Sequence, residues 1–185
     1  MCAETPPLRV TVATVMSAMP EKHVNAVIYG NPGIGKSWSM QYLLRRLLDC
    51  AGGPDGATKV GTIVWGRHGR FLQFARRAGG GWDVMRSSMC PHSGLLQPAF
   101  LLFDVCKEEV TERTAWFSDF VSCVFATSPD PQMYQHVRKA LRPKFFIMEP
   151  WASEELVTVA PDFAEEGAVV RERVRVLGGI PRSVL

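Results

Sequence analysis

The sequence has no long hydrophobic run. Its 185 residues contain no apolar stretch approaching the ~20 residues that a membrane-spanning helix needs. The first ten residues, MCAETPPLRV, lack the basic region and apolar core of a secretory signal. We therefore expect an intracellular protein that has no membrane partner.

Cysteine and net charge are also low. The five cysteines are odd in number and have no C-x-x-C spacing, which predicts reduced thiols rather than a disulfide framework. Cys90 and His92 lie close together, but two residues do not make a zinc site. A net charge of +3 neither indicates nor excludes nucleic-acid binding. There are no internal repeats, and a composition that is 46% hydrophobic fits one globular domain.

Residues 30–37, GNPGIGKS, match the phosphate-binding pattern G-x-x-x-x-G-K-[ST]. The glycines let several backbone N–H groups point at one phosphate, and the following helix adds the positive end of its dipole. Lys36 is expected to reach the β- and γ-phosphates, and Ser37 to ligate Mg²⁺. The alternative is a glycine-rich turn that binds nothing. The predicted nucleotide contacts in this segment are Gly30, Asn31, Pro32, Gly33, Ile34, Gly35, Lys36, Ser37 and Trp38.

Apolar patterns predict alternating strands and helices. A segment at 71–74 is expected to pair back on the second strand across a turn at His68 and Gly69, and Ser153 to cap the last helix. This alternation favours an α/β fold, a three-layer α/β/α sandwich with a parallel sheet covered by helices on both faces. The predicted strands span 23–29, 59–65, 99–103, 120–126 and 144–148, and the predicted helices 36–50, 109–118, 132–141 and 153–159.

Asp104 ends the apolar run Phe100-Leu101-Leu102-Phe103. Ligands of open α/β sheets bind at the carboxyl ends of strands, so an acid there is placed to hold Mg²⁺, as in the Walker B pattern. The alternative is an aspartate that caps the next turn. Many ATPases place glutamate directly after this aspartate to orient water, but this chain has Val105. Glu108 is the candidate catalytic carboxylate from the following loop, and its alternative is a solvated helix start.

Polar residues also follow the predicted strand at 120–126. Thr127 or Ser128 could sense the γ-phosphate, or they could belong to the turn that Pro129 and Pro131 indicate. Because the chain has no N-K-x-D motif for guanine, ATP is the expected nucleotide.

Basic residues near the end of the chain offer further candidates. Arg138 and Arg142 occupy the region that supplies an arginine finger in ring-forming ATPases, although solvated side chains are the plainer interpretation. Gly178-Gly179-Ile180-Pro181-Arg182 is a turn or helix-start signal. Beside a phosphate loop it is typical of the base of an ATPase lid, which makes Arg182 a candidate phosphate contact.

The series GNPGIGKS, AFLLFD, VFATSPDP, FFIMEPWASEEL and VVRERVRVLGGIPR resembles the P-loop domain of trypanosome retrotransposon hot spot proteins and the related ATPase header of Crinkler-type effectors. The resemblance covers nearly the whole chain, from about residue 23 to 182. It implies a five-stranded parallel core of the additional-strand type, with the Walker B strand and one further strand between the first two. It also implies ATP, Mg²⁺ and frequent nuclear residence within larger proteins.

We therefore expect an N-terminal lead-in segment (1–22), a P-loop NTPase core (23–160) and the start of an incomplete lid (161–185). The expected function is slow ATP hydrolysis that drives assembly or a conformational change, with a homo-oligomer or protein partner. The alternative is a nucleotide-binding switch with little hydrolysis. A small-molecule kinase is disfavoured by the GGIPR ending, and a nucleic-acid-dependent motor would need a basic surface groove.

Overall fold

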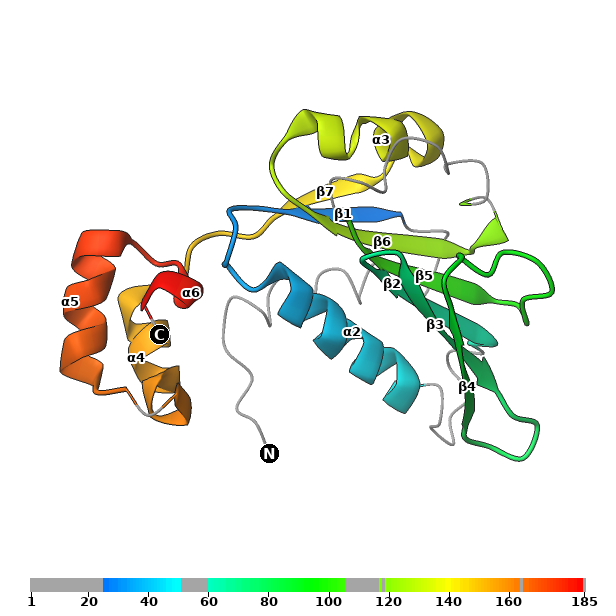
Figure 1. The fold of residues 1–185 in the computed structure, drawn as a ribbon, viewed down its shortest axis with the longest axis horizontal. Coiled ribbons are helices and arrows are strands. Elements are labelled where there is room, and N and C mark those ends of the chain that lie inside the picture. The colour runs from blue at the N-terminus through cyan, green and yellow to red at the C-terminus, as the bar shows by residue number, and fades with distance from the viewer. Residues whose placement is uncertain (1–24, 51–59, 106–116, 118, 164, 185) are drawn as a thin grey trace.

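The computed structural model describes residues 25–50, 60–105, 117, 119–163 and 165–184, which form an α/β fold around one mixed sheet (Figure 1). In the described part of the chain this sheet has seven strands in the order β4-β3-β2-β5-β6-β1-β7. The strands are β1 (Ala26–Tyr29), β2 (Thr62–Arg67), β3 (Arg70–Arg76), β4 (Trp82–Ser87), β5 (Ala99–Asp104), β6 (Ser122–Thr127) and β7 (Lys144–Ile147).

The sheet is mixed rather than wholly parallel, which corrects the expectation from the alternating pattern. Each neighbouring pair from β2 through β5, β6 and β1 to β7 is parallel. The two remaining pairs, β2 with β3 and β3 with β4, are antiparallel. The expected hairpin between β2 and β3 is confirmed. His68 and Gly69 have φ values of 50° and 65°, because a tight two-residue turn between twisted strands requires positive φ at both positions.

Helices cover both faces of the sheet. Helix α2 (Lys36–Cys50) packs Met40, Leu43 and Leu47 against Ile28 and other side chains of one face. Helix α3 (Gln135–Leu141), which follows the short 3₁₀ helix η2 (Pro131–Met133), packs on the opposite face through Val137. Figure 1 shows α2 below the sheet and α3 above it.

The last helices form a group beyond the end of β7, at the left of Figure 1. They are α4 (Ser153–Val159), the 3₁₀ helix η3 (Ala160–Phe163), α5 (Gly167–Leu177) and α6 (Pro181–Val184). Leu156 of α4 and Val170 of α5 are fully buried in the same hydrophobic cluster as α2, so the group shares a core with the sheet.

The expected N-cap of α4 is wrong. Ala152 is the N-cap, and its backbone N–H donates to the Glu155 carboxylate at 2.8 Å, while Ser153 lies one position later. This arrangement is the second half of a capping box, in which an acid of the first turn binds the N-cap N–H.

The other predicted helices and strands agree with the structure to different degrees. The predicted bounds of α2 and α4 match, and the remaining predicted strands are present with ends shifted by a few residues. Strand β4 and helix α5 were not predicted. The helix expected over 109–118 lies almost entirely outside the described residues. None of the described helices is long and apolar enough to cross a bilayer.

Candidate functional site

The loop formed by residues 30–37, called here the 30–37 loop, joins the carboxyl end of β1 to the first turn of α2. Gly33 and Gly35 have φ values of 80° and 106°, a conformation that favours glycine. A Cβ added at Gly30 would lie 2.5 Å from the carbonyl oxygen of Met148. The three glycines therefore permit a backbone path that side chains would obstruct.

The C-terminal helices hold this loop from one side. The indole Nε1 of Trp151 donates a buried hydrogen bond of 2.9 Å to the carbonyl of Ile34, 117 positions away in sequence. Ile34 is fully buried, so its side chain anchors the loop while its carbonyl binds the indole. A Cβ on Gly33 would lie 3.0 Å from side-chain atoms of Ile180 and Arg182. Sequence reasoning did not include Trp151 in the site, although this residue lies within the stretch FFIMEPWASEEL that carries the family resemblance.

Lys36 is folded back over its own loop. Its Nζ donates to the carbonyls of Gly30 and Asn31, both at 2.7 Å. Burial lowers the pKa of the Lys36 ammonium, Asp104 opposes that shift, and Arg182 adds to it. The ammonium therefore lies within electrostatic reach of both predicted partners, Asp104 from β5 and Arg182 from α6.

Asp104 is the last residue of β5 and is 9% exposed. Its Oδ2 lies 3.2 Å from Nε of Arg67, the residue directly opposite at the end of β2. The contact is an ion pair without the alignment of a hydrogen bond at Nε. Sequence reasoning missed Arg67. The signal was available, because Arg67 and Asp104 end neighbouring parallel strands.

Thr127 ends β6, the strand between β5 and β1, and pairs in register with Tyr29. It is 2% exposed, and its hydroxyl has no hydrogen-bond partner among the described residues. The following turn is capped by Asp130, whose carboxylate accepts from the N–H of Gln132 at 3.0 Å. Neither Thr127 nor Ser128 is therefore needed as the cap of η2, and Ser128 is partly exposed beside Thr127.

The remaining predicted contacts lie on the surface of this region. Ser37 is partly exposed in the first turn of α2, and Trp38 beside it is 69% exposed. Asn31 and Pro32 are exposed at the tip of the loop, and Arg182 is exposed in α6.

Glu108 lies outside the described residues, so its predicted role stays a prediction. Two other predicted residues are described but lie away from this region. Arg138 and Arg142 are exposed on and after α3, on the face of the sheet opposite to α2. The Arg142 backbone, with a φ of 45°, forms the C-cap of that helix.

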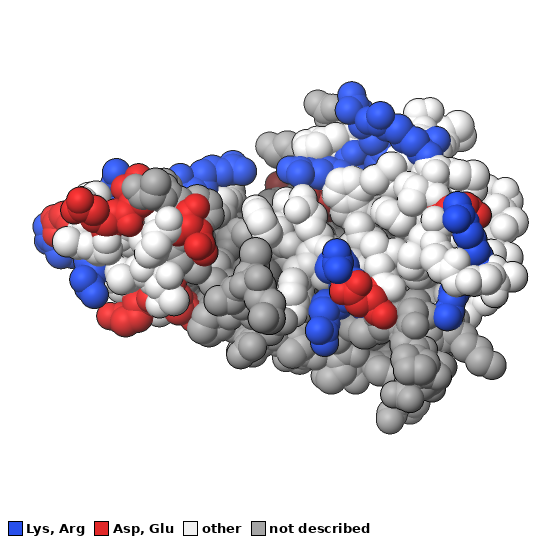
Figure 2. Space-filling view, turned by 90° about the horizontal axis from the view of Figure 1, so that it is seen from below, with Lys and Arg blue, Asp and Glu red and all other residues white. Residues whose placement is uncertain are grey.

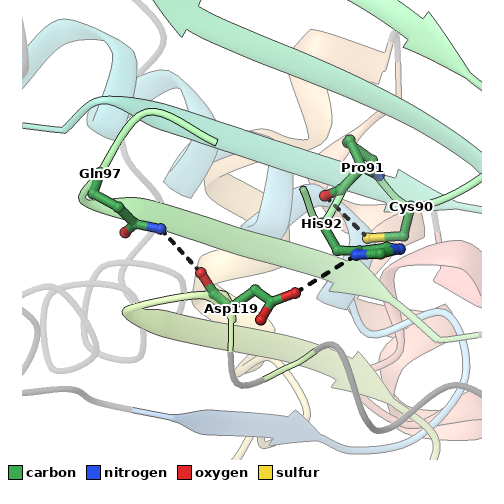
Figure 3. Close-up of polar contacts among 5 residues, drawn as sticks. All are labelled: Cys90, Pro91, His92, Gln97 and Asp119. Carbon is green, nitrogen blue, oxygen red and sulfur yellow. Dashed lines mark hydrogen bonds and ion pairs between the residues drawn. The ribbon is translucent and has the colours of Figure 1, made fainter. Parts of the chain in front are cut away.

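Cys90 and His92 lie in the segment between β4 and β5, where His92 faces Asp119 (Figure 3). His92 Nδ1 is 3.6 Å from a carboxylate oxygen of Asp119, which precedes β6, and the Cys90 thiol donates to the Pro91 carbonyl at 3.8 Å. In Figure 3, Gln97, which precedes β5, binds the Asp119 carbonyl from the other side. Among the described residues, no group of three or more His, Cys, Asp or Glu could hold a metal ion.

No protein-family model matches the chain, and no curated protein matches its sequence.

Proposed function

We propose that this chain binds ATP with Mg²⁺ at the 30–37 loop and slowly hydrolyses the bond between the β- and γ-phosphates. The observation that carries the proposal is a meeting of three parts at one edge of the sheet. These parts are a glycine-lined loop that enters a helix, the Lys36 ammonium, and the Asp104 carboxylate. Parallel strands bring such parts together because their carboxyl ends share one edge.

The strand order supports a P-loop NTPase domain of the additional-strand type. β5, which ends at Asp104, and β6 lie between β1 and β2, and these strands run parallel with β7. The resemblance to retrotransposon hot spot and Crinkler-type domains implies this order, and their intracellular, often nuclear, residence belongs to the same proposal. The β3–β4 hairpin is an addition at the β2 edge of that core.

The residues present fit a nucleoside triphosphate with its metal ion. Gly33 and Gly35 adopt the positive φ that lets a loop wrap its backbone around a phosphate, and the buried Thr127 hydroxyl has a donor to offer. Mg²⁺ in such sites depends on one or two protein ligands together with phosphate oxygens. Ser37 and Asp104 would be those protein ligands.

Each side chain then has a distinct role. Bound ATP and Mg²⁺ would supply the reactive anhydride and the positive charge that balances its phosphates. Lys36 would exchange its contacts with the Gly30 and Asn31 carbonyls for phosphate oxygens. Thr127 would donate to the terminal phosphate, and Arg182 would approach from α6. Glu108 is the proposed group that orients water.

A nucleotide-binding switch is the second candidate, and Val105 favours it. This residue occupies the position after Asp104, its side chain is buried, and its N–H donates to the Ala126 carbonyl at 2.8 Å. An apolar side chain there cannot orient water. The hydrogen bond from Trp151 to Ile34 would instead transmit the state of the loop to the C-terminal helices.

Binding and turnover of the same preparation test these proposals. We expect Lys36→Ala to weaken mant-ATP binding by about 10-fold or more, because a charged hydrogen bond contributes roughly 1.5–3 kcal/mol. Asp104→Ala should retain binding but lose its dependence on Mg²⁺ and most phosphate release. Lys139→Ala, which removes an exposed lysine of α3, is the matched control and should behave like the wild type.

The outcomes separate the two candidates. Wild-type phosphate release above the Asp104→Ala background supports the ATPase. Tight binding with release equal to that background supports the switch. A wild type that binds no nucleotide overturns both.

A further inference from the structure

A second surface feature lies on the sheet extension formed by β2, β3 and β4. It is an open groove with a volume of about 470 Å³. We call it the β2–β4 groove, and its lining residues are Trp65, Arg67, His68, Arg70, Leu72 and Arg86. The lining contains three arginines and one histidine but no acidic residue, so the groove is suited to an anionic ligand.

The strand register fixes how these side chains are arranged. Trp65 of β2 lies opposite Leu72 of β3, and Leu72 lies opposite Arg86 of β4. Arg67 lies opposite Arg70 at the end of the same hairpin. Since side chains directly opposite each other project from the same face, the groove has an apolar middle with guanidinium groups at its side and end.

The positive charge of this groove is only partly balanced. Arg67 is paired with Asp104, but Arg70 and Arg86 are exposed and have no ion pair with a described residue. Like charges directly opposite on neighbouring strands repel each other, and Arg67 and Arg70 form such a pair. An anion placed between Arg70 and Arg86 would balance positive charge that no described acidic residue neutralises.

The charge distribution on the surface also favours an anionic ligand in the β2–β4 groove. On the face shown in Figure 2, Asp and Glu gather over the C-terminal helices, whereas the sheet-bearing part shows Lys and Arg more than acids. On that face the acidic residues are concentrated over the C-terminal helices, at the end of the molecule opposite to β3 and β4, and there they would repel a polyanion.

We propose that the β2–β4 groove binds single-stranded nucleic acid, with phosphates on Arg70 and Arg86 and a base against Trp65 and Leu72. Aromatic and aliphatic side chains flanked by arginines accept unpaired bases while the guanidinium groups follow the backbone. An acidic peptide would also pair with the arginines, but it has no base to stack against the partly exposed Trp65 and would gain little from that residue. Duplex DNA is read by a helix or ribbon that enters its major groove, whereas the lining residues given above form a concave surface.

This binding goes beyond the proposed nucleotide function and does not require it. The residues that carry it are on β2, β3 and β4, while the 30–37 loop follows β1. Arg67 is the residue between the two regions, because it lines the groove and contacts Asp104. The test therefore uses no ATP and leaves Arg67 unchanged.

Fluorescence anisotropy of a labelled oligo(dT) of 15 nucleotides, measured over a range of salt concentrations, tests the proposal. We expect Arg70→Gln with Arg86→Gln to weaken binding by about 10-fold at low salt. The slope of log affinity against log salt should fall by about 1.4, since each phosphate contact on a single strand contributes about 0.7. The control is Arg138→Gln with Arg171→Gln, which removes two exposed charges from helices and should leave affinity within about twofold.

Trp65→Leu separates stacking from charge. It should weaken binding by about 10-fold with the salt slope unchanged, because stacking contributes roughly 1–3 kcal/mol per base. Trp65 also packs on the core, so circular dichroism is used to check folding, and the arginine variants test the proposal whether or not this variant folds.

Several results would overturn the proposal. If the wild type does not bind oligo(dT) at low salt, the groove is not a nucleic-acid site. The same holds if the control pair of substitutions weakens oligo(dT) binding as much as the Arg70 and Arg86 substitutions do. Competition by poly-glutamate as effective as by oligo(dT) would assign the groove to an acidic protein. Equal competition by a single nucleotide, at matched phosphate concentration, would reduce it to a mononucleotide site. Tighter binding of a duplex would contradict the single-strand assignment.

Discussion

The Lys36 ammonium interacts both with its own loop and with charged side chains from β5 and α6. Two loop carbonyls accept its hydrogen bonds, Asp104 attracts it, and Arg182 repels it. Burial is the largest influence and lowers its pKa below the ordinary value of 10.5. The proposed phosphate contact therefore depends on a lysine that loses its proton more readily than a solvated one.

This pKa predicts how nucleotide affinity depends on pH. Lys36 carries its charge only below its pKa, so mant-ATP affinity should fall as pH rises towards 10.5, at a lower pH than an ordinary lysine would give. Asp104→Asn removes the interaction that raises the pKa and should move this loss to still lower pH. Affinity titrations of both proteins between pH 7 and 10 would measure the difference.

Lys36→Arg is the control for that titration, because arginine stays charged throughout this range. Its affinity should be flat with pH even if its geometry lowers the affinity itself. A wild-type affinity that is also flat, or an Asp104→Asn profile that moves to higher pH, would contradict the role given to Lys36.

At the scale of secondary-structure elements, the link between the C-terminal helices and the 30–37 loop depends on a close backbone contact. The Trp151 N–H donates to the Gly179 carbonyl at 2.8 Å, and the Trp151 indole in turn donates to Ile34. A Cβ at position 179 would overlap the carbonyl oxygen of Trp151. Glycine is therefore required at 179 by space, since its φ is not among the positive values.

Gly179→Ala should loosen this link. We expect a loss of about 1–3 kcal/mol in the free energy of unfolding, as for other overpacked sites, together with weaker mant-ATP binding. Urea unfolding and nucleotide titration measure the two effects. Gly79→Ala is the matched control: a Cβ there meets no atom within 4 Å, so its stability should change by less than about 0.5 kcal/mol. Equal stability of both variants would show that the contact is unimportant.

The elements also show which parts of the fold are readable from sequence. Strand β5 was predicted because Phe100 to Phe103 form a continuous apolar run, as buried strands do. β4 was missed because it is mostly exposed and shows no apolar alternation, and its pairing with β3 determines it instead. Helix α5 is rich in valine, which is a weak helix former, and packing of Val170 compensates for it.

The candidate site was partly predictable for a similar reason. Local motifs identified the 30–37 loop, Lys36, Asp104 and Thr127, since each follows or ends an apolar strand. The contacts of Arg67 with Asp104 and of Trp151 with Ile34 join elements far apart in sequence. They depend on strand order and on the docking of the last helices, which local patterns do not specify.

At the scale of the whole molecule, sheet and C-terminal helices share one hydrophobic cluster. Trp151, Leu156 and Val170 belong to it together with Met40 of α2 and Leu102 of β5. Because separation of these parts would expose that common core, we expect a single cooperative unfolding transition. The Trp151 hydrogen bond to Ile34 places the proposed nucleotide loop within the same unit.

Ligand binding should therefore stabilise the whole described fold rather than the loop alone. MgATP at about 100 times its dissociation constant should add about 2.7 kcal/mol and raise the thermal midpoint by about 5–10 °C. Far-UV circular dichroism and tryptophan fluorescence should shift together, because the helices and Trp151 unfold as one unit. Lys36→Ala should keep the cooperative transition but show no such shift. A fluorescence transition that precedes the loss of helix signal would contradict the single cooperative unit, and with it the expectation that nucleotide bound at the loop stabilises the whole described fold.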